Sequence, residues 1–262
     1  MKKILLVLSI STSIAFATLS LHADYLRPYS VDQDKPSVDR IYVAGNISYA
    51  FSNSLKNAIL SDEVYPNTPH DIPSTTATSI DKFIGSSFEI GYTLTPIYRV
   101  GAEYNYGKTK NTIQGKTWSG TQNDTQKSNI TMNTFTVNGY INLNGVAGLN
   151  FGKFNPYIGA GLGVAVNKQG VITETATGNT SPGASEINGK TKTAFAWQIM
   201  LGTQYSLTKN LSLNVGYKYT SAGKTESGTI ENDPSSSVPL SVSPQKSDLH
   251  SNEIYAGLLY QF

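Results

Sequence analysis

The last twelve residues, Ser251 to Phe262, read S-N-E-I-Y-A-G-L-L-Y-Q-F and decide the fold. One parity of this stretch consists of Ile254, Ala256, Leu258, Tyr260 and Phe262. Such strict alternation predicts a β-strand with two unlike faces. An aromatic residue at the last position, with another two positions earlier, suits a strand end at a lipid boundary, where aromatic rings form a girdle. The stretch therefore predicts the closing strand of a membrane β-barrel.

Composition favours a membrane protein built from strands over one built from helices. Of the 262 residues, 39% are hydrophobic, 15% are charged and none is Cys. Each spanning helix would need about 20 consecutive apolar residues, whereas a barrel strand needs them only at alternate positions. The lack of Cys excludes disulfides and thiolate metal sites, and no basic block indicates nucleic-acid binding. We expect no cofactor and no metal.

The N-terminus has the pattern of a secretory signal peptide. Lys2 and Lys3 precede a largely apolar stretch, 4–21, and the segment ends in Leu-His-Ala at 21–23. We expect residues 1–23 to be cleaved off; an uncleaved anchor is disfavoured because Ser and Thr interrupt a short apolar core. Removing those two lysines from the 20 basic residues leaves 18, equal to the 18 acidic ones. Residues 24–38 are read as an irregular periplasmic lead-in to a barrel at 39–262.

Eight alternating stretches make up the predicted barrel. They are 39–51, 81–94, 97–107, 129–143, 155–166, 192–207, 211–220 and 251–262. The four long polar links are 52–80, 108–128, 167–191 and 221–250. Since backbone groups in lipid must all be paired, the sheet has to close. The predicted fold is all-β, an eight-stranded antiparallel up-and-down transmembrane barrel with periplasmic ends and extracellular long loops. A soluble lipocalin-type barrel, with the apolar parity inward, is the structural alternative.

Five charged residues fall on the inward parity: Glu89, Arg99, Glu103, Lys218 and Glu253. The first three lie on neighbouring strands, and so do the last two. Charges inside a narrow barrel are expected to pair, because unpaired burial is costly. We expect a static network that fills the lumen, since eight-stranded interiors are usually filled by side chains. The alternative is a gate whose pairs exchange and open a small ion path.

Two local patterns suggest other chemistries. The G-A-G-L-G run at 159–163 alternates along a strand and opens no helix, so it indicates close packing and not a nucleotide loop. His250, Ser251 and Glu253 resemble the residue set of barrel lipid deacylases, but His250 and Ser251 fall on opposite faces of the strand. We therefore predict no catalytic residue and no enzyme.

Trp118 stands in the second long link among Gly, Thr and Lys. It is a candidate contact anchor for a partner, because aromatic residues dominate binding hot spots. Packing against the barrel rim explains it equally well.

Several phrases resemble the opacity-protein and outer-membrane-protein-A-type barrel superfamily. They are T-V-N-G-Y-I-N-L at 136–143, N-P-Y-I-G-A-G-L-G-V-A at 155–165, F-A-W-Q at 195–198, L-S-L-N-V-G-Y-K-Y at 211–219 and the closing Y-A-G-L-L-Y-Q-F. The layout is also similar to the small surface adhesin barrels of host-associated bacteria. The resemblance implies a bacterial outer-membrane protein in contact with outer-membrane lipid. It also implies that the barrel-assembly machinery recognises a terminal signal at Leu258, Tyr260 and Phe262.

The favoured function is that of a surface adhesin or antigen that binds a host or environmental ligand through its extracellular loops. A small porin-like channel through the polar lumen is the first alternative. A purely structural envelope barrel and a lipid-modifying enzyme follow.

Overall fold

The computed structural model describes residues 41–56, 75–116, 123–144, 146–177, 184–232, 239–241, 244 and 246–262. All of them belong to the second of two units, residues 39–262. The predicted signal peptide, 1–23, and the predicted lead-in, 24–38, lie outside the described residues. Within the described ranges, no helix has the length and apolar character needed to cross a membrane.

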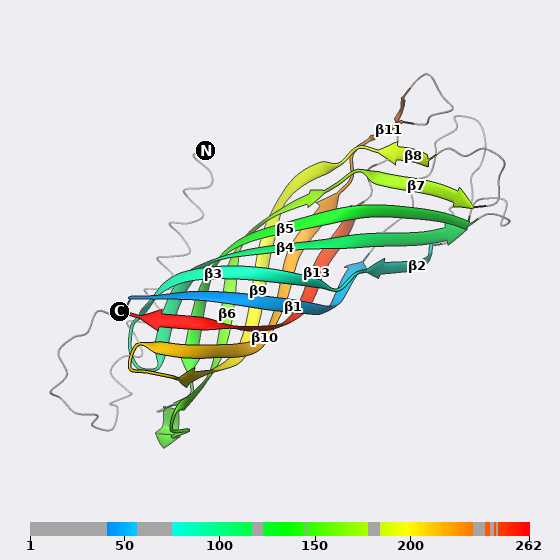
Figure 1. Ribbon diagram of the computed structural model, residues 1–262. Helices are drawn as coiled ribbons and strands as arrows, with labels where there is room; N and C mark the ends of the chain where they lie inside the picture. Colours follow the sequence, from blue (N-terminus) through cyan, green and yellow to red (C-terminus); the bar gives the residue numbers. More distant parts are fainter. Residues whose placement is uncertain are drawn as a thin grey trace, which may run out of the picture. The chain divides into compact units, whose positions relative to one another are not determined.

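One antiparallel sheet makes up almost all of the described structure. Its strands are β1 (Ile41–Lys56), β2 (Thr75–Ile80), β3 (Phe83–Thr93), β4 (Tyr98–Lys116), β5 (Asn123–Asn142), β6 (Phe154–Gln169), β7 (Ile172–Thr177), β8 (Ala184–Ile187), β9 (Lys190–Ser206), β10 (Leu211–Glu226), β11 (Ile230–Asn232), β12 (Leu240–Ser241) and β13 (Lys246–Gln261), with a 3-10 turn, η1 (Val146–Gly148). Eight strands close a ring in the order β5-β6-β9-β10-β13-β1-β3-β4, and β4 pairs back onto β5 (Figure 1). The predicted eight-stranded transmembrane barrel is confirmed.

The terminal stretch closes the ring as its alternation predicts. Along β13, Tyr260 lies opposite Val43 of β1, and the Phe262 amide donates to the Ile41 carbonyl at 3.0 Å. Leu258 and Tyr260 point outward and are exposed, whereas Leu259 between them is buried. The seam joining the first and last ring strands leaves no free sheet edge there, as lipid requires.

The apolar parity of the ring strands faces outward. Large exposed side chains form a belt around the barrel, among them Ile47, Ile84, Val137, Leu162 and Phe195. The inward parity is buried and largely polar. This orientation excludes the lipocalin-type alternative, which would bury the apolar parity.

The predicted strand ends are wrong at one end of the barrel. The links predicted to begin at 52, 108, 167 and 221 begin inside strands, because β1, β4, β6 and β10 run on to Lys56, Lys116, Gln169 and Glu226. The strands β2, β7, β8, β11 and β12 extend the sheet further at this end, opposite the C-terminus (Figure 1). Beyond the apolar belt the outward face becomes polar too, so the alternation of apolar residues disappears although backbone pairing continues.

Two bulges interrupt the ladders on the two sides of β13. One lies between Ala50 and Ser52 of β1 against β13, and the other between Ser221 and Gly223 of β10. Gly223 has a φ of 67°, a left-handed conformation that glycine adopts readily. The second bulge shifts the parity of β10, so Lys224 is exposed and Thr225 is buried.

Candidate functional site in the barrel lumen

Inward tyrosines occupy the lumen where glycines leave room for them. The directly opposed pairs are Tyr42 with Gly91, Tyr140 with Gly159, Tyr157 with Gly202 and Tyr255 with Gly216. A Cβ atom at Gly159 would lie 2.6 Å from Cδ1 of Tyr140, and one at Gly202 would lie 2.6 Å from the Tyr157 hydroxyl. The glycines are therefore needed for close approach, as expected for the run at 159–163.

Arg99 lies among these rings. Its Cζ is 4.1 Å from the centroid of Tyr140, 4.6 Å from that of Tyr157 and 5.5 Å from that of Tyr42. With its oxygen turned toward Arg99, the Gln204 amide accepts hydrogen bonds from both terminal guanidinium nitrogens, Nη2 at 3.2 Å. Cation–π contacts of this kind are strongest where water is excluded, and Arg99 is only 4% exposed.

Glu89 is held by hydroxyl and amide donors. Tyr42 donates to its Oε1 at 2.6 Å, Tyr140 donates to Oε2, and Asn138 Nδ2 donates to Oε2 at 2.9 Å. Glu103 lies directly opposite Glu89 across β3 and β4. The same Asn138 amide donates to Glu103 Oε2 at 3.0 Å. One amide thus bridges two carboxylates that would otherwise repel each other across neighbouring strands.

Lys218 reaches from β10 to the carboxylate of Glu103 on β4. Its Nζ lies 3.5 Å from Glu103 Oε1 and 3.9 Å from Glu253 Oε2, and it also donates to Asn105 Oδ1. Glu253 accepts a further hydrogen bond from Ser251 at 2.7 Å. All the charged side chains in this cluster are less than a tenth exposed. Buried ion pairs of this type are tolerated only with additional hydrogen bonds, which are present here.

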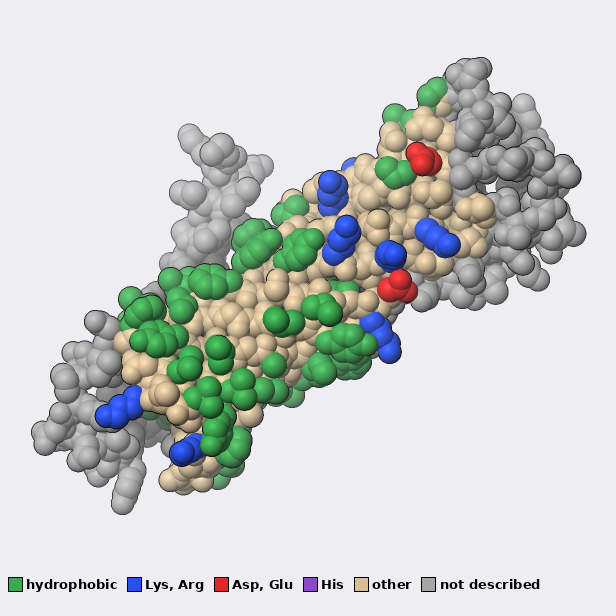
Figure 2. Space-filling view, viewed as in Figure 1, with side chains coloured by type: hydrophobic (Ala, Val, Ile, Leu, Met, Phe, Trp, Pro, Cys, Tyr) green, Lys and Arg blue, Asp and Glu red, His purple; other side chains and the backbone are tan. Residues whose placement is uncertain are grey.

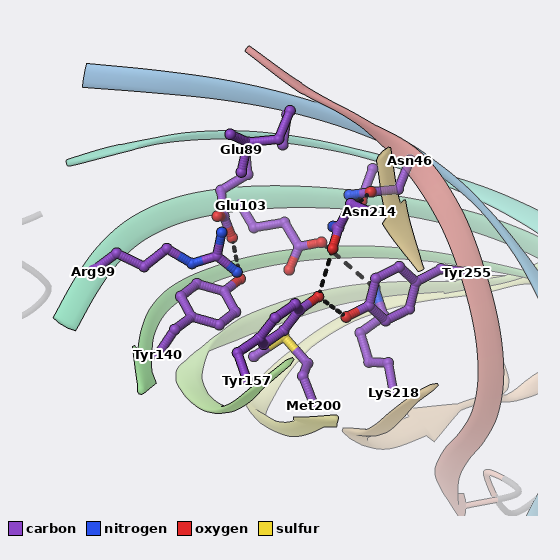
Figure 3. Close-up of a pocket in the computed structure, with 13 residues that line it drawn as sticks. Asn46, Glu89, Arg99, Glu103, Tyr140, Tyr157, Met200, Asn214, Lys218 and Tyr255 are labelled. Atoms are coloured by element: carbon purple, nitrogen blue, oxygen red, sulfur yellow. Dashed lines mark hydrogen bonds and ion pairs between the residues drawn. The ribbon is translucent and has the colours of Figure 1, made fainter. Parts of the chain in front are cut away.

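The structure thus brings all five predicted lumen residues into the buried interior of the barrel, with partners that differ in part from those expected. Figure 3 shows Glu89, Arg99, Glu103 and Lys218 around a cavity. Among the described residues, Arg99 forms no ion pair with a carboxylate and contacts the tyrosine rings instead. Lys218 pairs with its neighbour Glu253, as its strand position suggests, and also with Glu103 across the lumen. Strand neighbourhood predicts the first kind of contact but not the second.

Little space remains inside the barrel. One cavity of about 20 Å³ lies among Glu89, Arg99, Glu103 and Lys218, and a second of about 20 Å³ lies beside Glu253. A space of this size holds about one water molecule. Further toward the end with the long strands, the lumen contains a buried apolar cluster of Ala50, Phe83, Ile130, Met132, Ala165, Ala196, Ala222 and Leu249. A static filling accounts for this geometry more directly than an ion path.

Sequence reasoning missed the amides that connect the charges. Gln198 donates to Glu103 Oε2 at 2.7 Å and to Asn138 Oδ1 at 2.8 Å. Gln198 and Asn138 are each 1% exposed. Their inward parity was the available signal, because a buried amide inside a barrel needs several partners.

Of the residues considered for catalysis, His250 has partners different from those of Ser251 and Glu253. His250 stacks on Tyr219 of β10, with ring centroids 6.0 Å apart, and its Nδ1 lies 3.1 Å from the Tyr219 hydroxyl. The Ser251 hydroxyl instead donates to Glu253.

Two other predicted sites remain. Trp118, the candidate contact anchor, lies outside the described residues. At the predicted assembly signal, Tyr260 and Phe262 form an edge-to-face pair with ring centroids 5.1 Å apart.

A closed ring with an apolar outer belt and a filled polar lumen defines the class of outer-membrane β-barrels. The family model for the outer membrane protein beta-barrel domain matches residues 9–262, and the chain belongs to this family. It is a bacterial outer-membrane protein. In fold it resembles OprG from Pseudomonas aeruginosa, with a TM-score of 0.51 and 16% identity, over 86% of this chain and 96% of that one.

Two curated relatives come from different bacterial genera. The chain is 36% identical to outer membrane protein PagN of Salmonella typhimurium over 101 residues, which is 37% of each protein, so this match spans well under half of that relative. It is 26% identical over 239 residues to a Rickettsia conorii protein named "Putative adhesin RC1281", covering 87% of this chain and 89% of the relative.

Proposed function

We propose that this outer-membrane protein is a surface adhesin that binds its partner at the end of the barrel where the strands are long. The observation that carries this proposal is the contrast between the two parts of the molecule. The lumen is filled by buried side chains, whereas among the described residues the sheet continues past the apolar belt at one end. The adhesin name of the Rickettsia relative supports the same reading.

The orientation that the proposal requires has the long-strand end outside the cell. In support, the opposite end has short turns, such as the one that joins β9 to β10, which is typical of the periplasmic side. Because the chain has no Cys, single substitutions can be labelled cleanly. Asn188→Cys, at the long-strand end, should react with an impermeant maleimide on intact cells, and Asn210→Cys, in the short turn, only after lysis. The reverse pattern would contradict the proposal.

Binding itself is tested by exchanging the four connections at the long-strand end. One exchange variant is made for each of the predicted links 52–80, 108–128, 167–191 and 221–250. Each variant replaces only those residues of the link that lie outside the strands, so that the pairing between strands is retained. Adhesion of expressing bacteria to host cells is then measured for each exchange, with Trp118→Ala as a smaller change in the second link. Loss of adhesion after any one exchange is the expected result. Undiminished adhesion after all four exchanges would overturn the proposal.

The terminal strand has a second proposed role as the signal for the barrel-assembly machinery. Leu258, Tyr260 and Phe262 share the outward face, with exposures of 50%, 43% and 54%. Replacing Phe262 with Ser should lower the amount assembled in cells and leave refolding of the purified chain into detergent unchanged. Equal loss in both assays would mean that Phe262 serves stability only.

A further inference from the structure

Four lysines share the outward face of the long strands β4, β5 and β6. Lys108 and Lys110 lie on β4, Lys127 on β5 and Lys168 on β6, and all four are exposed. Register places Lys108 and Lys168 on either side of Thr131, and Lys127 opposite Thr112. These four residues are called the lysine patch. Figure 2 shows blue side chains gathered on this part of the wall, beyond the zone of green hydrophobic side chains.

The patch begins directly above the aromatic edge of the lipid-facing belt. Tyr106 precedes Lys108 by two residues, and Tyr104 packs on Phe135 with centroids 4.9 Å apart. Two residues of strand span about 7 Å, and strands in such barrels tilt by about 35–45°, so Lys108 lies roughly 5 Å above the tyrosine ring level. That is the level of lipid headgroups, which extend about 5–7 Å beyond each side of the hydrocarbon core.

The four charges are close together and lack partners within the described part of the chain. Adjacent strands lie about 4.8 Å apart, so Lys108 and Lys168 are separated by roughly 10 Å, comparable to the screening length at physiological salt. None of the ion pairs among the described residues includes a lysine of the patch. Asp81 flanks the patch, with its amide donating to the Lys110 carbonyl. Four like charges in this arrangement attract anions to this face of the barrel.

The other side of the barrel differs at the same end. On β10 and β13, Lys224 lies opposite Asp248, and Glu226 lies opposite Lys246. Glu226 also pairs with Lys190 and Lys192. Basic residues there have acidic neighbours, so within the described residues the excess of positive charge is larger on β4, β5 and β6.

We infer that the lysine patch binds the phosphate groups of an anionic glycolipid in the outer leaflet of the same membrane. Lysine ammonium groups are effective point-charge partners for phosphate. The patch begins at headgroup height with Lys108 and continues outward from the lipid-facing belt. This site is distinct from the adhesive connections. Its placement in the outer leaflet rests on the orientation proposed above, but phosphate binding by the patch does not.

The test uses the full refolded protein in nanodiscs of phosphatidylcholine. The added lipid can enter both leaflets, so the orientation of the barrel in the nanodisc does not affect the result. Diphosphorylated lipid A is titrated in, and retained lipid is counted by native mass spectrometry. The quadruple variant K108Q/K110Q/K127Q/K168Q should bind at least about tenfold more weakly, since each surface lysine is typically worth a several-fold factor. The charge-matched control K153Q/K209Q/K224Q/K246Q should weaken binding much less, because its lysines do not form one cluster and Lys224 and Lys246 lie opposite acidic residues.

Two further arms identify the ligand. Lipid A with both phosphates removed should bind the wild type as weakly as diphosphorylated lipid binds the quadruple variant. Inositol hexakisphosphate, a soluble phosphate-rich anion, should compete poorly at equal phosphate concentration. Equal losses in the quadruple and control variants, or equal binding of dephosphorylated lipid, would overturn the inference. Full competition by the soluble anion would show that the patch binds free polyanions instead of a membrane lipid. None of these outcomes depends on adhesion.

Discussion

Replacing Lys218 with Met tests whether the lumen network holds the barrel together. Lys218 is 3% exposed and its Nζ lies 3.5 Å from Glu103 and 3.9 Å from Glu253. At an effective dielectric constant near 20, each contact is worth about 4–5 kcal/mol of attraction. The cost of desolvating an ammonium group, several kcal/mol, is recovered when the lysine is removed. We therefore expect a net loss of about 3–5 kcal/mol in the free energy of unfolding, as when one partner of a buried pair is deleted.

The assay is reversible urea unfolding in lipid vesicles, followed by the fluorescence of Trp197, which packs beside Tyr219 at a centroid distance of 5.3 Å. Lys209→Met, in an exposed turn, is the matched control and should change stability by less than about 0.5 kcal/mol. Adding Glu103→Gln and Glu253→Gln to Lys218→Met should restore most of the loss, because all three charges are then gone. A loss below about 1 kcal/mol for a correctly folded Lys218→Met barrel would refute this account of the network.

Three other results are expected. Gly202→Ala should lower the free energy of unfolding by about 1–3 kcal/mol in the same assay, because the added methyl group meets the Tyr157 hydroxyl. Adding Tyr157→Phe to this variant should recover part of the loss. An unchanged stability of Gly202→Ala would show that the close approach is not needed. Hydrogen bonds from Lys192 and Lys190 lower the pKa of Glu226 to about 2. The depressed pKa contributes stability that is complete above the ordinary value of 4.5 and is lost as pH falls toward 2. At neutral pH, Glu226→Gln should therefore cost up to about 1 kcal/mol, since both lysines are partly exposed. The difference from wild type should shrink below the ordinary pKa of 4.5 and disappear as the pH falls through about 2. A difference independent of pH would contradict this. In planar bilayers the refolded protein should show no stable conductance. Steady currents that change when Arg99 or Lys218 is replaced by a neutral residue would instead favour the channel function.

The sequence alone was sufficient for the class of fold and, within the apolar belt, for the face on which the strand side chains lie. Period-two alternation is a local property, so Leu258 and Tyr260 could be placed outside and Glu253 inside from the terminal twelve residues. The same rule placed all five lumen charges on the inward parity. It failed where strands left the apolar belt, as in the outer half of β4, because polar residues on both faces remove the signal.

Only the tertiary structure decided which inward residues meet. Lys218 contacts Glu103 from the other side of the lumen, and Asn138 bridges Glu89 and Glu103. Such contacts depend on the tilt and stagger of the strands around the ring, which set the height of each residue and which no single strand encodes. The lysine patch has the same origin, because its members come from three strands and only their register brings them together.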